Sequence, residues 1–370
     1  MNTQKANIAR MTLPPGRRIL AVSDIHGNLP YFKGLLQKTG FCDDDILIID
    51  GDFIEKGEYS LDTLHFVMEL VRRGNVHAVC GNCDGWNSIF TMSEDALAES
   101  LAFLKSKKRG LIWDMCLKLG IDLMSAESLR PFKRVLADSF RAEFDFLAAL
   151  PQAIETEHYI FVHAGIHGDK ALNDHRPGEL QKYDDFMNRG HKFSKWVIVG
   201  HWPVMLYGTD RVCANPVIDR ASRIVSIDGG CVLKDDGQLN ALVIPFDGSE
   251  DFSHIAYDSF PTARAMTYQP EGARSYYIRW GDNEVQVIKR GEEFSRCRHV
   301  RTGYEMDILT KYLYGEGELV RVNDCTDYVP EVFPGDEISI VETTSRGYFI
   351  KRGGYSGWYF GTVHSSQCTV

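Results

Sequence analysis

Short apolar runs alternate with amphipathic segments over the first 84 residues of the chain. The runs at 19–22, 45–50 and 76–80 have the length and the largely apolar character of strands that are buried on both faces. Between them, residues 32–38 and 61–73 carry apolar side chains at helical spacing. This βαβαβ order predicts parallel strands joined by right-handed crossovers, with the carboxyl ends of the strands at one edge of an α/β sheet.

A second pattern begins near residue 90. Leucine and aromatic residues recur there at helical spacing, which predicts a helical insertion at about 90–151. Further apolar runs then complete the main domain, which we place at 18–248 after an N-terminal tail at 1–17. These runs lie at 159–165, 196–203, 224–230 and 239–244.

The last third of the chain has a different character. Residues 249–272 lose all periodicity, which predicts a linker, and residues 273–370 are rich in short β patterns. The spacing of four short strands predicts a small barrel at about 317–365. Pro-Gly-Asp at 334–336 and Gly-Trp-Tyr at 357–359 resemble bacterial SH3-like domains. That resemblance implies a peptide or protein as a candidate partner for the barrel.

Polar residues stand at the end of nearly every apolar run in the main domain. Asp24 and His26 follow the first run, and at period 2 their side chains point the same way. Because the carboxyl ends of parallel strands share one edge, we expect these polar ends to converge. Imidazole and carboxylate groups together are ligands for borderline divalent ions. The six candidate ligands are Asp24, His26, Asp52, Asn82, His163 and His201.

Five ordered motifs resemble those of the calcineurin-like metallophosphoesterases. They are Asp-x-His-Gly-Asn at 24–28, Gly-Asp-x-x-x-x-Gly at 51–57, Gly-Asn-x-Asp at 81–84, His-Ala-Gly at 163–165 and Gly-His-x-Pro at 200–203. The resemblance covers residues 18–244. It implies a four-layer αββα sandwich and two divalent metal ions, with Mn, Fe or Zn as the candidates.

The same resemblance implies how the ligands divide between the ions. Asp24 and His26 would hold one ion, and Asp52 would bridge both. The second ion would be held by Asn82, His163 and His201.

Departures from the resembled motifs concern the substrate. Proteins of the PPP-type phosphatase and diadenosine tetraphosphatase groups carry Asp-Arg where this chain has Glu55 and Lys56. Lysine is a point charge rather than a bidentate fork, so we do not expect the bidentate phosphate clamp of those groups here. Lys56 remains our main candidate for binding the substrate phosphate. Asn28 and His167 are further substrate-binding candidates. Arg189 is open to two interpretations, a second phosphate ligand or, more commonly for such a residue, a surface side chain.

Cys83 stands where PPP-type enzymes carry the histidine that protonates the leaving group. We assign Cys83 to catalysis as a weak proton donor, and Asp84 as the residue that orients this position. The sequence Gly-Asn-Cys-Asp is similar to small bacterial and archaeal phosphodiesterases, which usually carry a later Gly-His-x-His that this chain lacks. The chain therefore combines features of two subfamilies.

Composition narrows the function classes. The formal net charge of -10 argues against a broad nucleic-acid surface. No apolar run reaches about 18 residues, so we expect no membrane span. The polar first residues lack the apolar core of a secretory signal, and the nine cysteines are an odd number. Together these features predict reduced thiols and a cytoplasmic location.

The prediction from sequence is a dinuclear metal-dependent phosphoester hydrolase that acts on a phosphorylated substrate. The resemblance implies that a metal-bridging hydroxide attacks phosphorus in line. Two alternatives stay open at this point. One is a phosphodiesterase or dinucleoside polyphosphate hydrolase, because Cys83 replaces the histidine acid. The other is a catalytically impaired binding or scaffold module.

Overall fold

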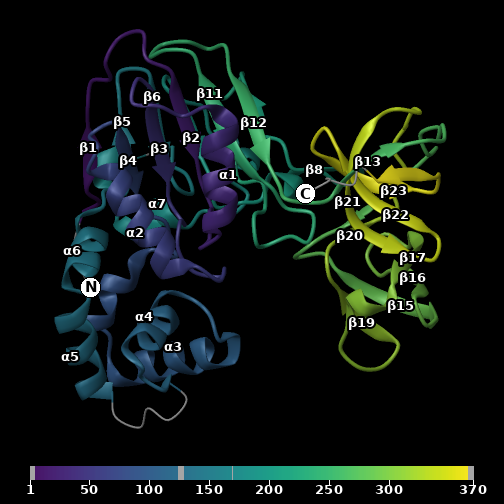
Figure 1. Ribbon diagram of the computed structural model, residues 1–370, viewed down its shortest axis with the longest axis horizontal. Coiled ribbons are helices and arrows are strands. Elements are labelled where there is room, and N and C mark those ends of the chain that lie inside the picture. The colour runs from purple at the N-terminus through teal and green to yellow at the C-terminus, as the bar shows by residue number, and fades with distance from the viewer. Residues whose placement is uncertain (1–4, 124–128, 169, 366–370) are drawn as a thin grey trace. The chain divides into compact units, whose positions relative to one another are not determined.

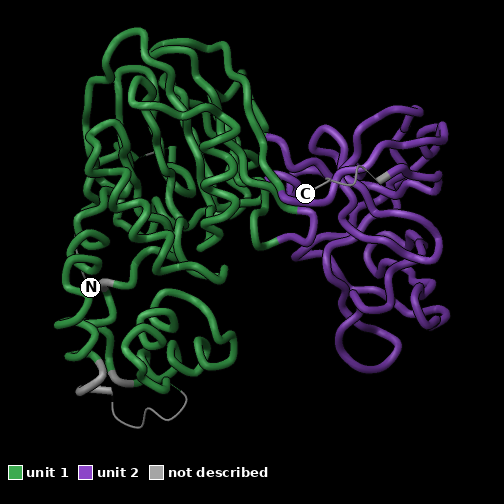
Figure 2. The backbone as a smooth tube through the Cα atoms, in the orientation of Figure 1, with its two compact units in different colours: residues 1–203, 216–233, 237–258 green, residues 204–215, 234–236, 259–370 purple. Residues whose placement is uncertain are grey.

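The computed structural model describes residues 5–123, 129–168 and 170–365. The chain forms two compact units, each assembled from separate stretches of sequence (Figure 2). Unit 1 comprises residues 1–203, 216–233 and 237–258, and unit 2 comprises residues 204–215, 234–236 and 259–370. The predicted boundary at residue 248 treated the main domain as one continuous stretch. The chain instead leaves unit 1 twice before residue 259.

Unit 1 contains two sheets rather than the single sheet that the strand pattern predicts (Figure 1). The strands of the first sheet are, in spatial order, β12 (Ser253–Tyr257), β11 (Leu239–Ile244), β2 (Ile19–Val22), β3 (Ile46–Asp50) and β4 (Val76–Val79). Strand β3 is parallel to its neighbours β2 and β4, and β11 is antiparallel to β2.

The second sheet is built around the parallel strands β6, β7 and β10. Its strands, in spatial order, are β1 (Ile8–Arg10), β5 (Ala153–Glu155), β6 (Tyr159–Val162), β7 (Trp196–Val199), β10 (Ile224–Ser226) and β9 (Val217–Asp219). Strand β1 lies inside the stretch predicted to be an N-terminal tail. It pairs in parallel with β5, so that part of the prediction is wrong.

Alternating side chains show how the two sheets stack. Along β2, Ile19 and Ala21 join a core that also contains Phe161 of β6 and Trp196 of β7. The intervening Leu20 joins a different core, on the helical side of the first sheet. Each sheet therefore has one face against the other sheet and one face against helices. This arrangement confirms the four-layer αββα sandwich and explains why the strands are apolar on both faces.

Helices cover the outer face of the first sheet. Helix α1 (Leu29–Thr39) begins with a proline in its first turn and ends at Gly40, whose φ of 62° is the left-handed conformation of a helix C-cap. Helix α2 (Ser60–Val71) buries Leu64, Val67 and Leu70 in the core on the helical side of the first sheet. On the second sheet, the short helix α7 (Pro177–Gln181) contributes Leu180 to a third core.

The predicted insertion is helical. Its elements are η1 (Gly85–Phe90), α3 (Glu94–Lys107), α4 (Leu111–Leu119), α5 (Leu129–Ser139) and α6 (Arg141–Ala149). Leu97, Leu101 and Leu104 of α3 are buried and belong to the core on the outer face of the first sheet. The leucine stripe of the insertion is therefore a packing stripe, as expected for such spacing.

Unit 2 consists mainly of strands. A six-stranded sheet contains β24 (Val363–Ser365), β13 (Thr262–Ala265), β21 (Glu337–Thr344), β22 (Gly347–Arg352), β23 (Tyr355–Tyr359) and β8 (Val212–Cys213). A five-stranded sheet contains β17 (Glu305–Leu309), β16 (Phe294–His299), β15 (Glu284–Lys289), β19 (Leu319–Val322) and β18 (Leu313–Tyr314). Strands β14 (Tyr277–Ile278) and β20 (Cys325–Thr326) form a separate pair.

Two predictions for this region differ from the structure. The expected linker at 249–272 contains β12, which extends the first sheet of unit 1, and β13, which joins the six-stranded sheet of unit 2. The expected barrel at 317–365 joins strands from different sheets, because β19 pairs with β15 and β18 while β21, β22 and β23 pair with one another. Both errors arise because strand pairing across long loops leaves no local periodicity. Within the described residues, none of the helices combines the length and apolar character that a bilayer crossing requires.

Strand β12 can be tested as a structural part of unit 1. The ring of Tyr257 packs so closely on α1 that a Cβ at Gly34 would lie 2.2 Å from its Cζ atom. Gly34→Ala should therefore lower the free energy of unfolding by about 1 kcal/mol, since overpacking costs ~1–3 kcal/mol and outweighs the ~1 kcal/mol gain in helix propensity. In a Tyr257→Ala background the same change should stabilise the protein. Chemical denaturation of the four proteins measures this reversal of sign. An equal effect of Gly34→Ala in both backgrounds would contradict the packing.

Candidate metal centre

The six predicted ligands follow strands at the carboxyl edges of the two sheets in unit 1. The first sheet supplies four of them and the second supplies two. In chain order they are Asp24 and His26 after β2, Asp52 after β3, Asn82 after β4, His163 after β6 and His201 after β7. The backbone N–H of His201 donates to Oδ2 of Asp24 at 2.9 Å, so the edges of the two sheets meet at this point.

Backbone strain is concentrated at these residues. Asp24, His26, Asp52 and His201 have φ values of 55°, 50°, 50° and 65°. The left-handed region costs a residue with a side chain about 1–3 kcal/mol, and such strain persists where the surrounding structure enforces it, often at functional sites. Four of the six predicted ligands are therefore held in costly conformations that aim their side chains at one place.

Asp24, His26 and Asp52 form a buried group. Nε2 of His26 lies 3.6 Å from Oδ1 of Asp24 and 3.9 Å from Oδ2 of Asp52. Among the described residues, neither Nε2 of His26 nor Oδ1 of Asp24 has a hydrogen-bond partner. Burial lowers the pKa of His26 to about 3, so its imidazole is neutral and carries a lone pair. A buried neutral imidazole beside two carboxylates fits a divalent cation, which would satisfy these atoms.

His163 is oriented by the backbone. Its Nδ1 lies 3.0 Å from the carbonyl oxygen of Asp50, which directs Nε2 toward the centre of the site. Nε2 lies 3.4 Å from Oδ1 of Asp52 and 3.2 Å from the amide oxygen of Asn82. Burial opposes ionisation of both His163 and Asp52, but their mutual attraction raises the pKa of the first and lowers that of the second. A cation bound here would replace the proton that this pair otherwise holds.

His201 has a comparable arrangement. Its Nε2 lies 2.9 Å from Oδ1 of Asp184, which leaves Nδ1 directed at the site. The terminal amide atom of Asn82 that faces His163 also lies 2.8 Å from this Nδ1. When the amide oxygen occupies that position, three lone pairs converge from Asn82, His163 and His201. Such convergence is repulsive by itself and favourable around a cation.

Two groups of three potential ligands result, and Asp52 belongs to both. One group consists of His26, Asp52 and Cys83, and the other of Asp24, Asp52 and His163. Within each group the ligand atoms lie within 4.8 Å of one another. Asp52 is the residue that was predicted to bridge the two ions, and that role stays a prediction. The other ligands divide differently from the predicted division, because Asp24 lies with His163 and Cys83 lies with His26.

Comparison with known proteins decides the family. Residues 17–229 match the sequence model of the calcineurin-like phosphoesterases, which is more than half of the chain. The protein belongs to the calcineurin-like phosphoesterase family. It is therefore a metal-dependent hydrolase that acts on phosphoesters.

Solved structures with a similar fold are distant in sequence. A candidate diadenosine tetraphosphatase is 18% identical, with 69% of this chain and 100% of that chain covered and a TM-score of 0.44. A protein serine/threonine phosphatase from Saccharomyces cerevisiae is 11% identical, with 69% and 84% covered and a TM-score of 0.41. A metallophosphoesterase from Sphaerobacter thermophilus is 17% identical, with 65% and 89% covered and a TM-score of 0.35. No curated protein sequence matches the chain.

In this phosphoesterase, Asp84 contacts the backbone. Its Oδ2 accepts hydrogen bonds from the N–H groups of Asp52 and Gly81 at 2.7 and 2.8 Å. Its Oδ1 accepts from Phe53 and Ile54 at 3.2 and 3.4 Å. The predicted catalytic role, orienting residue 83, is not what these contacts show. Asp84 is a positioning residue that fixes the loop carrying Asp52.

Cys83 lies between Asp52 and Lys56. Its backbone N–H donates to Oδ1 of Asp52 at 2.8 Å, and its sulfur accepts from the side-chain amide of Asn82 at 3.2 Å. Burial and the Asp52 carboxylate raise the pKa of the Cys83 thiol above its usual range. The thiol is thus close enough to the site to contact a substrate, and it holds its proton strongly.

Lys56 is placed to attract an anion. Its backbone has a φ of 64°, in the same left-handed region as four of the predicted ligands. Burial opposes its charge, but Cys83 and the carboxylates of Asp52, Asp24 and Asp228 outweigh that effect and raise its pKa. A lysine that stays cationic beside the metal ligands fits the predicted role of binding phosphate.

The remaining substrate-binding candidates have other contacts. The side chain of Asn28 accepts from the N–H of Tyr31 at 3.3 Å, as the N-cap of α1. The ring of His167 stacks on Tyr183 with centroids 4.3 Å apart. Arg189 donates to the carbonyl oxygen of Asp184 and lies 5.6 Å from the Tyr183 ring centroid. These contacts hold the three side chains in place, and a role for any of them in binding the substrate stays a prediction.

Three acidic residues near the ligands were not predicted from the sequence. Asp228 follows β10 and is fully buried. Burial of Asp24 and then the charge of Asp228 raise the pKa of Asp24. The sequence Asp-Gly-Gly at 228–230 ends an apolar run in the same way as the predicted ligand positions, so Asp228 could have been predicted from it. Asp184 orients His201 from a loop and has no comparable signal. Glu55 was noted only as a replacement in a motif.

Glu55 and Asp114 connect the insertion to the site. Oε1 of Glu55 accepts from the N–H of Leu111, the first residue of α4, at 2.7 Å. In return, Oδ2 of Asp114 in α4 accepts from the N–H of Leu61 in the first turn of α2 at 3.1 Å. Glu55, before α2, therefore satisfies a backbone N–H at the start of α4, and Asp114 in α4 satisfies one at the start of α2. The insertion is therefore docked against the loop that carries Lys56.

The pH dependence of stability tests this docking through Glu55→Gln. Burial raises the pKa of Glu55 to about 7 from 4.5, so the folded protein holds this proton more tightly than the unfolded chain. This group therefore lowers the free energy of unfolding as the pH rises from about 4.5 to 7. Glutamine keeps an oxygen for the N–H of Leu111. Glutamine does not titrate, so only the wild type loses stability between about pH 4.5 and 7. The unfolding free energy of the variant minus that of the wild type should therefore rise between these pH values and stay constant above about pH 7.

Urea denaturation at several pH values between 5 and 8 measures this difference. The exposed Glu157→Gln change serves as the matched control, for which we expect no trend. A difference for Glu55→Gln that stays constant with pH would show that Glu55 is not held in this environment.

Proposed function

We propose that this phosphoesterase uses two divalent cations to hydrolyse phosphoesters or phosphoanhydrides that have good leaving groups. The observation that carries the proposal is the pair of ligand groups sharing Asp52, with Lys56 beside them. Imidazoles, carboxylates and one amide are donors for borderline ions, so Mn, Fe and Zn are the candidates. When bound, such ions act as Lewis acids toward phosphate oxygens and lower the pKa of water.

The residues of the chain have separable roles in this proposal. Asp24 and His26 would hold one ion, Asn82, His163 and His201 would hold the other, and Asp52 would contact both. The ammonium group of Lys56 would hold a non-bridging phosphate oxygen and neutralise part of its charge. Asp84 acts only through the loop that it fixes.

Leaving-group chemistry narrows the substrate class. An alkyl phosphomonoester leaves as a basic alkoxide and benefits from general acid catalysis, which is typically worth about 10²–10⁴-fold. Burial and Asp52 raise the pKa of the Cys83 thiol, which then gives up its proton reluctantly, whereas cations at the neighbouring ligands would favour the thiolate, which has no proton to give. Cys83 is a poor acid in both cases. Aryl monoesters, aryl diesters and phosphoanhydrides have leaving groups that are stable as anions, so these groups depart without such help. These substrates are therefore favoured over phosphoserine or phosphothreonine.

Asp52→Asn tests the bridging position. Asparagine keeps the oxygen that accepts from the Cys83 N–H, so the fold should be retained. The lost charge should remove most of the bound metal and lower hydrolysis of an aryl phosphate at least 100-fold. Metal analysis measures the bound metal, circular dichroism measures the fold, and initial rates measure hydrolysis. The exposed Asp44→Asn change controls for the loss of one carboxylate. Full metal occupancy with a wild-type rate in Asp52→Asn would refute the assignment.

Cys83→His tests the leaving-group argument. An imidazole at this position can donate a proton, so the variant should gain activity on alkyl phosphomonoesters relative to aryl phosphodiesters, by about tenfold or more. The quantity to measure is the ratio of the two kcat/KM values at fixed metal loading. Cys83→Ser controls for loss of the sulfur. The argument fails if Cys83→His leaves the ratio unchanged, or if the wild type already prefers alkyl monoesters.

A further inference from the structure

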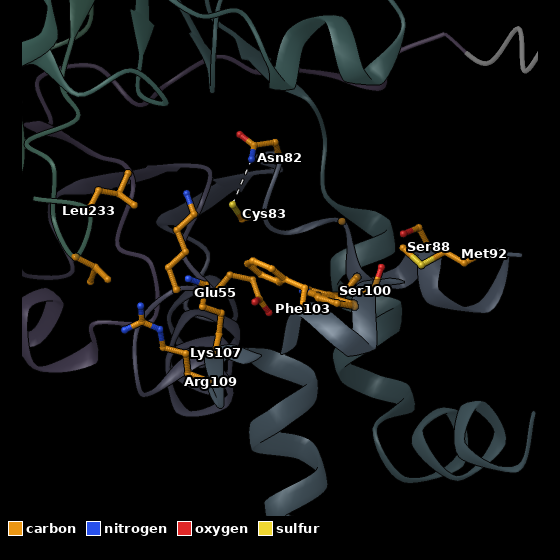
Figure 3. A pocket seen from close by; sticks show the side chains of 14 residues that line it. Glu55, Asn82, Cys83, Ser88, Met92, Ser100, Phe103, Lys107, Arg109 and Leu233 are labelled. Carbon is orange, nitrogen blue, oxygen red and sulfur yellow. Dashed lines mark hydrogen bonds between the residues drawn. The ribbon is translucent and has the colours of Figure 1, made fainter. Parts of the chain in front are cut away.

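A cavity of about 670 Å³ lies beside the predicted metal ligands in unit 1. One end of it is formed by residues already described, Lys56, Asn82 and Cys83. The rest is formed by the helical insertion and by the loop after Asp228 (Figure 3). The insertion and this loop contribute Trp86, Phe103, Lys107, Arg109, Val232 and Leu233. A substrate phosphate at the metal ligands would therefore have the rest of its molecule in this cavity.

Positive charge is the first distinctive property of the cavity. Lys107 and Arg109 are exposed at its wall, and Figure 3 shows them close to Glu55. Within the described part of the chain, neither side chain forms an ion pair with a carboxylate. Glu55 is the one carboxylate among the lining residues, and it is bonded to the N–H of Leu111. Unpaired cations that gather in a protein of net charge -10 indicate an anionic ligand.

Aromatic surface is the second property. Phe103 is 59% exposed although its ring is large and apolar. Nζ of Lys107 lies 5.9 Å from the centroid of this ring, so a cation and an aromatic face are offered together. The side chain of Trp86 is hydrogen-bonded to Glu55, which orients its indole. Flat aromatic faces next to cations suit a planar ring that carries phosphates.

The leaving group of a phosphoanhydride suits a cavity that is lined by cations. It departs as a phosphate, which is stable as an anion because its second pKa is about 6. Hydrolysis of a phosphoanhydride breaks the bond from phosphorus to the bridging oxygen and forms a bond to the oxygen of water. The electron pair stays on the departing phosphate, and one proton of the water is released to solvent. Cations near the departing phosphate stabilise the charge that it gains.

We propose that this cavity binds the leaving part of a nucleoside polyphosphate, with Lys107 and Arg109 on its phosphates and Trp86 and Phe103 against its base. The inference rests on the proposed function, because it places the reacting phosphate at the metal ligands. Lys107 and Arg109 are thus specificity-determining residues supplied by the insertion. A phosphopeptide has no second phosphate in this position and no planar base, so it would use neither feature.

The test compares substrates that differ in these two features. The enzyme is assayed with p-nitrophenyl phosphate, inorganic tripolyphosphate and adenosine triphosphate. In Lys107→Gln/Arg109→Gln, kcat/KM for both polyphosphates should fall at least tenfold relative to kcat/KM for p-nitrophenyl phosphate. Most of the loss should be in KM, because these side chains bind rather than react. In Phe103→Ala, kcat/KM for adenosine triphosphate should fall at least fivefold relative to kcat/KM for tripolyphosphate.

Lys105→Gln/Lys118→Gln is the matched control, because it removes the same charge from α3 and α4 outside the cavity. The inference is overturned if this control shifts the ratios as much as the cavity variant, or if the cavity variant affects all three substrates equally. It is also overturned if wild-type protein hydrolyses p-nitrophenyl phosphate but neither binds adenosine triphosphate in calorimetry nor hydrolyses it. That result would leave the proposed function standing. Failure to hydrolyse any phosphate compound would reject both.

Discussion

One buried carboxylate determines the geometry on which the rest of the site depends. Asp84 accepts four backbone hydrogen bonds from the loops that follow β3 and β4. It thereby holds Asp52 at a positive φ that the residue would not adopt by itself. Satisfying four buried donors is worth more than the strain, since each donor left unpaired would cost about 1–3 kcal/mol. Asp52 can then face ligands from both sheets.

The sandwich supplies the second constraint. Both sheets bury both faces, so their strands are fixed from two sides and their carboxyl ends are rigid platforms. Ligands placed on strand ends inherit this rigidity, which loops alone would not give. The hydrogen bond from the His201 backbone to Asp24 joins the edges at the site itself. Distances between ligands from different sheets are therefore set by the core and not by the ligands.

The helical insertion forms much of the cavity beside the predicted metal ligands. The reciprocal caps of Glu55 and Asp114 attach the insertion to α2 and to the loop with Lys56. As a result, cations and aromatic rings distant in sequence from the metal ligands line the same cavity. In the proposed function, Lys56, Cys83 and the insertion would act on the substrate together in this one region of the molecule.

The amino-acid sequence alone was enough to predict candidate ligands at the strand ends and the order of the motifs. Apolar runs, glycines and polar tips are local patterns, and parallel strands bring their carboxyl ends to one edge whatever else the fold does. Only the tertiary structure decided how the strands divide into two sheets, that residues 8–10 and 253–257 belong to them, and that Asp84 serves the backbone instead of Cys83. Strands distant in sequence pair, and a buried carboxylate accepts particular hydrogen bonds, because folding removes these groups from water together. Which groups are removed together depends on the packing of the whole molecule, so it cannot be predicted from any one segment of the chain.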